Sequence, residues 1–152
     1  MELNTFGTAL KFAMDLETRG QETFEKAHQI AQDPETKKVF LAFSDANRKR
    51  KAALERLYND SVYSDMDTGI FEPIRRMKTT DYLSPSKIDE SSNFFSVLSG
   101  ARDMEEKSNN FYLALANEVK SRLRRAASHL EKMAEENAER ALKIEAIQDQ
   151  DH

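Results

Sequence analysis

The segment LEKMAEENAERALKIEAI, residues 130–147, decides the fold of this chain. Its apolar residues recur at alternating steps of three and four, which is the period of a helix face that packs inside a bundle. Asn137 and Arg140 interrupt this apolar series at its centre. Three other tracts of the chain show the same period and the same kind of polar interruption. The four seams together predict a four-helix bundle with a polar layer inside an otherwise apolar core.

In each tract the predicted inward positions are apolar at both ends and polar in the middle. They are, in chain order, Leu10, Ala13, Glu17, Gly20, Phe24 and Ala27; Phe40, Phe43, Asn47, Arg50 and Leu54; Leu98, Ala101, Glu105, Ser108, Tyr112 and Leu115; Leu130, Met133, Asn137, Arg140, Ile144 and Ile147. A buried charge is costly unless it is paired, and the two Glu and two Arg make the layer neutral. We therefore expect these side chains to meet. The alternative is that the phase is wrong and the polar residues lie at an exposed rim.

The composition predicts one all-α domain over residues 1–152. The chain has four glycines, three prolines and no cysteine, so disulfides and thiolate metal sites are excluded. A third of the residues are charged but the net charge is only −4, which is typical of a solvated surface and not of a nucleic-acid-binding one. The start of the chain lacks a signal-peptide pattern, and no apolar run approaches the roughly 20 residues of a membrane span. We expect a cytoplasmic protein with no nucleic-acid or membrane partner.

The pattern predicts helices over about 4–32, 35–58, 90–120 and 121–148, with a crossover over about 59–89. Residues 33–35, Asp-Pro-Glu, are a good helix start, with a capping carboxylate and proline at the first helical position. The first two helices, and the last two, are joined by very short turns, so each pair is expected to form an antiparallel hairpin. Two hairpins joined by one long crossover is a standard four-helix arrangement.

The two halves of the chain resemble each other, which indicates an internal duplication. Leu16-Glu17 and Thr23-Phe24 match Met104-Glu105 and Phe111-Tyr112 at an offset of 88 positions. At an offset of 90, Phe40, Phe43, Asn47, Arg50 and Leu54 match Leu130, Met133, Asn137, Arg140 and Ile144. The polar layer therefore falls at equivalent positions in both halves.

These residues resemble the rubrerythrin branch of the ferritin-like superfamily over all four helices. The stretch 13–17, Ala-Met-Asp-Leu-Glu, with Phe24 is similar to the first helix of that family, and the stretch 101–105, Ala-Arg-Asp-Met-Glu, with Phe111-Tyr112 is similar to its third. The resemblance implies a bundle in which one Glu from each of these helices, and a Glu-x-x-His from each of the other two, hold two iron ions.

By position, Glu17 and Glu105 match the single-glutamate ligands of that family. Its two Glu-x-x-His motifs fall on residues 47–50, Asn-Arg-Lys-Arg, and 137–140, Asn-Ala-Glu-Arg, so Asn47, Arg50, Asn137 and Arg140 stand where ligands are expected. A guanidinium does not ligate metals. We expect Arg50 to pair with Glu17 and Arg140 with Glu105, the asparagines to hydrogen-bond across the centre, and no metal or other cofactor to bind at this vestigial site. The lack of cysteine also removes the iron–sulfur module that rubrerythrins commonly carry.

The leading interpretation is a ferritin-like protein that has lost its di-iron site and has a non-catalytic binding or structural role, so that no catalytic residue is expected. The alternative is a di-iron oxidoreductase or iron-handling protein that binds iron through other carboxylates, such as Asp45, Glu136 or Glu139. Those residues flank the inward positions, so that using them requires a rotated helix.

For three further features of the sequence, a structural role is simpler than a functional one. His28 completes a Glu-x-x-His on the first helix but lies about 16 Å along the axis from Glu17, too far to share a metal. The basic segment 120–125 hints at an anionic partner but more simply pairs with acids on neighbouring helices. The apolar crossover segment 70–77 either covers the side of the bundle or contributes to a homodimer contact.

Overall fold

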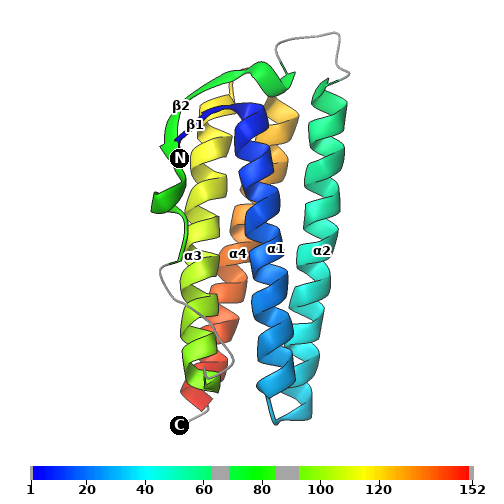
Figure 1. Ribbon diagram of the computed structural model, residues 1–152, viewed down its shortest axis with the longest axis vertical. Helices are drawn as coiled ribbons and strands as arrows, with labels where there is room; N and C mark the ends of the chain where they lie inside the picture. The colour runs from blue at the N-terminus through cyan, green and yellow to red at the C-terminus, as the bar shows by residue number, and fades with distance from the viewer. Residues whose placement is uncertain (1, 63–68, 85–92, 151–152) are drawn as a thin grey trace.

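The computed structural model describes residues 2–62, 69–84 and 93–150. Four helices form the bundle, and they are α1 (Phe6–Ile30), α2 (Pro34–Val62), α3 (Phe94–Val119) and α4 (Arg124–Gln150). Most of the helix–helix packing is within the hairpins α1–α2 and α3–α4, and α1 and α3 join the hairpins (Figure 1). The predicted four-helix architecture of two hairpins is confirmed at this level. Among the described residues, none of the helices combines the length and apolar character that crossing a bilayer requires.

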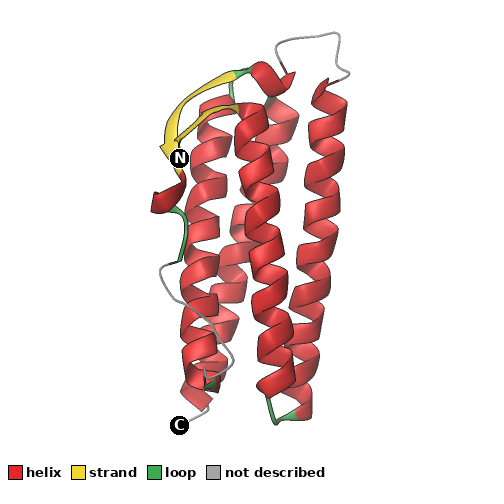
Figure 2. Ribbon diagram, viewed as in Figure 1, coloured by secondary structure: helices red, strands yellow, loops and turns green. Residues whose placement is uncertain are grey.

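A small antiparallel sheet accompanies the helices, and the sequence analysis did not predict it. Strand β1 (Glu2–Thr5) pairs with β2 (Pro73–Lys78) from the crossover, and Figure 2 shows both strands at the end of the bundle where α1 begins and α3 ends. The first helix begins at Phe6, two residues after the predicted start at about residue 4. Thr5 caps α1, since its side chain accepts a hydrogen bond from the Thr8 backbone N–H.

The helix ends follow from local capping. Asp33 accepts hydrogen bonds from the backbone N–H and the hydroxyl of Thr36, so α2 begins at Pro34, next to the predicted start. Asn93 caps α3, which begins after the predicted residue 90; residues 85–92 lie outside the described part. The predicted start of the fourth helix at residue 121 is wrong, because residues 120–123 form the turn that joins α3 to α4. Helix α2 continues to Val62, four residues beyond its predicted end.

The apolar core has two clusters with the polar layer between them. One cluster, toward the strands, contains Leu10 and Leu130, and the other contains Phe24 and Ile144. All predicted inward positions are buried except three that are half-buried, Phe43, Met133 and Ile147.

The described part of the crossover covers the bundle end beside the strands. A short 3-10 turn, η1 (Gly69–Phe71), leads into β2, and a second, η2 (Thr79–Asp81), follows it. From β2, Ile74 and Met77 are buried in the strand-end cluster, whereas Phe71 is 73% exposed. The apolar character of this segment is thus largely used within the chain.

Candidate functional site, a buried ring of polar side chains

The six residues of the predicted polar layer are all buried, each at most 8% exposed. They are Glu17, Asn47, Arg50, Glu105, Asn137 and Arg140. The alternative in which these residues lie at an exposed rim is therefore wrong. Each of the four helices contributes at least one of them, because each seam carries its polar interruption at a similar height in the bundle.

The asparagines connect the two hairpins. Asn47 donates from Nδ2 to Glu17 Oε1 at 3.0 Å and accepts at Oδ1 from Arg140 Nη1 at 3.3 Å. Thus the amide on α2 links a carboxylate of its own hairpin to the guanidinium of the other. Each asparagine side chain donates one hydrogen bond and accepts another. An ionised carboxylate in its place could only accept.

The second half repeats this arrangement and closes a ring. Asn137 donates to Glu105 Oε2 and accepts from Arg50 Nη1 at 2.8 Å. Arg50 Nη1 lies 3.6 Å from Glu17 Oε1, and Arg140 Nη1 lies 3.8 Å from Glu105 Oε1. Both arginine–glutamate pairs expected from the sequence are present. The ring runs through Glu17, Asn47, Arg140, Glu105, Asn137 and Arg50, and back to Glu17.

Gly20 makes room for this ring on α1. A Cβ at Gly20 would lie 2.5 Å from Asn47 Nδ2, closer than two non-bonded atoms can approach. At the equivalent position of α3 the chain has Ser108, which is buried without such a restriction. The glycine therefore reflects the close approach of α2 to α1 at the ring.

The two glutamates differ in one hydrogen bond. Tyr112 donates its hydroxyl to Glu17 Oε2 at 2.7 Å. The counterpart of Tyr112 in the first half is Phe24, which has no hydroxyl to offer Glu105. Burial raises the pKa of Glu105 to about 7, against the opposing effects of Arg140 and Arg50. Burial, and then the Glu17 carboxylate, raise the pKa of Tyr112 well above its ordinary value, so the phenol remains a donor.

The two arginines differ even more. Arg50 donates from Nη2 to the Met133 carbonyl at 2.6 Å and to Glu136 Oε1 at 3.2 Å, in addition to its ring contacts. Burial opposes the charge on Arg50, but the surrounding carboxylates, Glu17 first, outweigh it and raise its pKa. Arg140 has no such additional hydrogen bond among the described residues; each guanidinium lies over an aromatic ring, Arg140 over Phe43 at 5.4 Å from the centroid and Arg50 over Tyr112 at 5.9 Å. Burial lowers the pKa of Arg140, and Glu105 compensates only in part.

The donor set of the ring does not fit a pair of iron ions. It offers two carboxylates, two neutral amides and two guanidinium groups, and arginine nitrogens do not ligate metals. Of the carboxylates of the alternative interpretation, Asp45 pairs with Arg48 at 3.2 Å and Glu136 pairs with Arg50, and Glu136 and Glu139 lie on one groove without Asp45. Within residues 2–62, 69–84 and 93–150, no three His, Asp or Glu side chains are grouped as a metal site would require.

The other features singled out in the sequence lie away from the ring. His28 Nδ1 is 2.8 Å from the Lys37 carbonyl, so it joins α1 to α2 near the end of the hairpin. In the basic segment, Arg122 contacts the buried Glu72 at 2.6 Å and Lys120 contacts Glu131 at 3.8 Å. These pairs agree with the structural interpretation of that segment.

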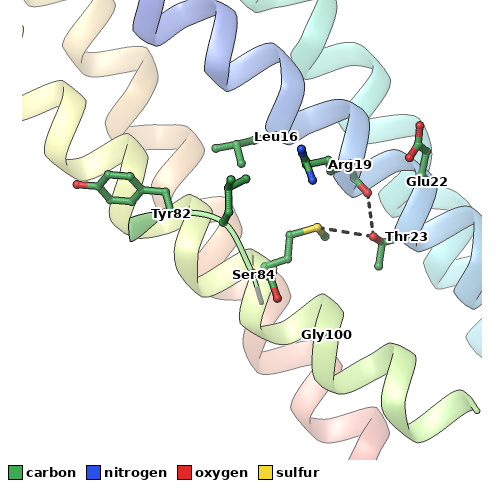
Figure 3. A pocket seen from close by; sticks show the side chains of 9 residues that line it. Leu16, Arg19, Glu22, Thr23, Tyr82, Ser84 and Gly100 are labelled. Carbon is green, nitrogen blue, oxygen red and sulfur yellow. Dashed lines mark hydrogen bonds between the residues drawn. The ribbon is translucent and has the colours of Figure 1, made fainter. Parts of the chain in front are cut away.

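A separate recess of about 180 Å³ lies between α1, α3 and the segment after η2 (Figure 3). In it the Thr23 hydroxyl donates to the Arg19 carbonyl at 2.8 Å and contacts Met104 Sδ at 3.7 Å. Leu16 and Met104 line it. No residue of the ring lines this recess, so it offers no route to the buried charges.

The roles of Tyr112, Glu136 and Gly20 were not predicted from the sequence. All three could have been found by asking where the two halves differ, since their counterparts are Phe24, Ala46 and Ser108. Comparison of the chain with known protein families, with curated proteins and with solved structures finds no match. The ring itself therefore carries the functional argument.

Proposed function

We propose that this chain is a ferritin-like bundle of the rubrerythrin type whose di-iron centre has been replaced by a self-neutralised ring, and that its role is non-catalytic. The observation that carries the proposal is the closed ring, in which Arg50 lies beside Glu17 and Arg140 beside Glu105. By the sequence resemblance, the arginines would stand at the imidazole positions of the family and the glutamates at its carboxylate positions. The positive charge that iron supplies in the family would here come from the chain.

Such a ring would hold the bundle together without the chemistry of a metal. The asparagine hydrogen bonds connect one hairpin to the other, and breaking a buried network of this kind leaves uncompensated charges. A binding or structural role needs a rigid scaffold of this kind and no redox centre. The proposal therefore assigns stability and specificity of packing to the former ligand positions.

Metal content of the purified protein tests the proposal directly. Protein expressed in iron-rich medium and analysed by plasma mass spectrometry should contain iron far below one ion per chain. A value near two, as in di-iron bundles, would overturn the proposal in favour of a di-iron oxidoreductase or iron-handling protein with other carboxylate ligands. Near-ultraviolet absorption and loss of stability with a chelator would accompany that outcome.

A reversal experiment tests the positional assignment. The variant N47E/R50H/N137E/R140H restores Glu-x-x-His on α2 and α4 and should bind about two iron ions per chain. The matched control N47E/N137E keeps both arginines and should bind none, because a guanidinium blocks each site. If the fourfold variant is helical and folded but takes up no more iron than the control, the positions are not former ligands.

A further inference from the structure

A groove of about 300 Å³ opens beside Arg140 on the face between α2 and α4. Its lining residues come from these two helices and are Phe43, Ala46, Glu136, Glu139, Arg140 and Lys143. The groove is open to solvent, and Arg140 belongs both to it and to the buried ring. It therefore gives one charge of the ring access to a molecule outside the bundle.

At the groove, one half of the chain has an alanine at the position where the other half has a carboxylate. In one half, Glu136 on α4 pairs with Arg50 on α2 at 3.2 Å. The offset of 90 that relates Asn47 to Asn137 relates Glu136 to Ala46. Arg140 therefore has a methyl group where Arg50 has a carboxylate, and this alanine lines the groove.

Arg140 also has unused donors. Its contacts to the described residues are the hydrogen bond to Asn47 and the ion pair with Glu105, both from Nη1, and the ring of Phe43. Nε and Nη2 thus have no hydrogen-bond partner within the described part of the chain, and the Arg140 side chain is 10% exposed. In Arg50, by contrast, both Nη atoms are bonded and Nε is enclosed. The free edge of the Arg140 guanidinium is a two-point donor for a planar anion.

We propose that this groove binds a small monocarboxylate, whose carboxylate accepts hydrogen bonds from Arg140 and takes the place that Glu136 has beside Arg50. The Phe43 ring and the Ala46 methyl group offer apolar surface to a short carbon chain, and Lys143 adds a second positive charge. Glu136 and Glu139 on the same walls disfavour ligands with two or more negative charges. The inference rests on the asymmetry of the ring and does not require that the ring was once a di-iron centre.

Titration with sodium butyrate tests the site on the intact chain. Nitrogen–proton correlation spectra at constant ionic strength should show saturable shifts of the Arg140 side-chain Nε–H and of the Phe43 and Ala46 amides, with a Kd in the millimolar range. Butyramide and sodium chloride at the same concentrations should not shift them. Equal shifts with either of these, or no shift at Arg140 with butyrate, would overturn the proposal.

The variant A46E supplies the missing carboxylate from the chain itself. It should weaken butyrate binding by about tenfold or more, because the new side chain occupies the guanidinium edge. The control A42E adds the same charge one turn earlier on α2, at an exposed position outside the groove lining, and should bind butyrate within about twofold of the unmodified protein. Unchanged binding by A46E, or an equal loss in A42E, would show that Arg140 is not the receptor. The titration reports on Arg140 and the iron analysis reports on metal in the ring, so failure of this inference is distinguishable from failure of the proposed function.

Discussion

The two halves of the ring use the same three kinds of contact but satisfy their charges to different degrees. On one side, Glu17 accepts from Tyr112 and Arg50 has Glu136 and a backbone carbonyl as additional partners. On the other side, Glu105 has Phe24 at the place of the tyrosine, and Arg140 has Ala46 at the place of the glutamate. We call the first side closed and the second open because Arg140 lines the groove and Arg50 does not, although both side chains are buried, at 10% and 7% exposed.

The six residues of the ring occur at equivalent positions in both halves of the chain, whereas the residues around them differ between the halves. The ring needs all six residues, because removing one partner leaves another buried and unpaired. The hydroxyl and the extra carboxylate are outside that requirement, so one half could lack them.

Replacing the arginines by methionine should affect the two sides unequally. Arg50→Met should lower the free energy of unfolding by about 3–5 kcal/mol, because it leaves Glu17 without its cation and Asn137 without its donor. Arg140→Met should cost about 1–3 kcal/mol, since Glu105 can take up a proton near neutral pH. Urea unfolding at pH 7 measures both. The exposed Arg48→Met, which breaks only a surface pair, should cost under about 1 kcal/mol. A larger loss of unfolding free energy in Arg140→Met than in Arg50→Met would contradict this difference between the two sides.

The open side should also make stability depend on pH. The pKa of Glu105 is about 7 in the folded chain and 4.5 is its ordinary value, so between these values the folded state holds a proton that the unfolded state has lost. The contribution of Glu105 is complete below about pH 4.5 and declines as pH rises through 7. The stability of the unmodified protein relative to Glu105→Gln should fall by about 3 kcal/mol in total across this window. Urea unfolding from pH 5 to 8 measures this, and parallel profiles would contradict it.

Removing the hydroxyl of Tyr112 should bring the closed side closer to the open one. Tyr112→Phe keeps the ring beneath Arg50 but deprives Glu17 of a hydrogen bond, at a cost of about 2 kcal/mol. Thermal or urea unfolding measures this cost. Tyr82→Phe serves as the control, and it should change stability by under about 0.5 kcal/mol, because Tyr82 contributes a ring contact that phenylalanine retains. Equal effects of the two changes would mean that the Glu17 bond is unimportant.

The close approach of α1 and α2 at Gly20 should have the smallest effect on stability. Gly20→Ala should destabilise the protein by about 1 kcal/mol, since its Cβ displaces Asn47 and the better helix propensity of alanine offsets part of that cost. Ser108→Ala, at the equivalent position, should be close to neutral. Unfolding curves of the two variants compare them, and a neutral Gly20→Ala would show that Asn47 moves freely.

The sequence by itself determined the four helices, their pairing into hairpins and the six residues of the ring. Helix periodicity is a local property, so it shows which side chains face inward before any partner is known. The electrostatic cost of burial then requires Glu17 and Glu105 to face Arg50 and Arg140. The strand formed by residues 2–5 escaped prediction because four residues are too few to show a period.

Only the tertiary structure decided which groups each ring member bonds. Asn47 bonds Arg140 and Asn137 bonds Arg50 because the relative height and rotation of α2 and α4 bring them together, and no local pattern encodes these quantities. The same geometry places Glu136 against Arg50 and leaves a groove at Arg140. The residue types that form the ring can be read from the sequence. Packing between the helices determines that Arg140 lines a groove and that Arg50 does not.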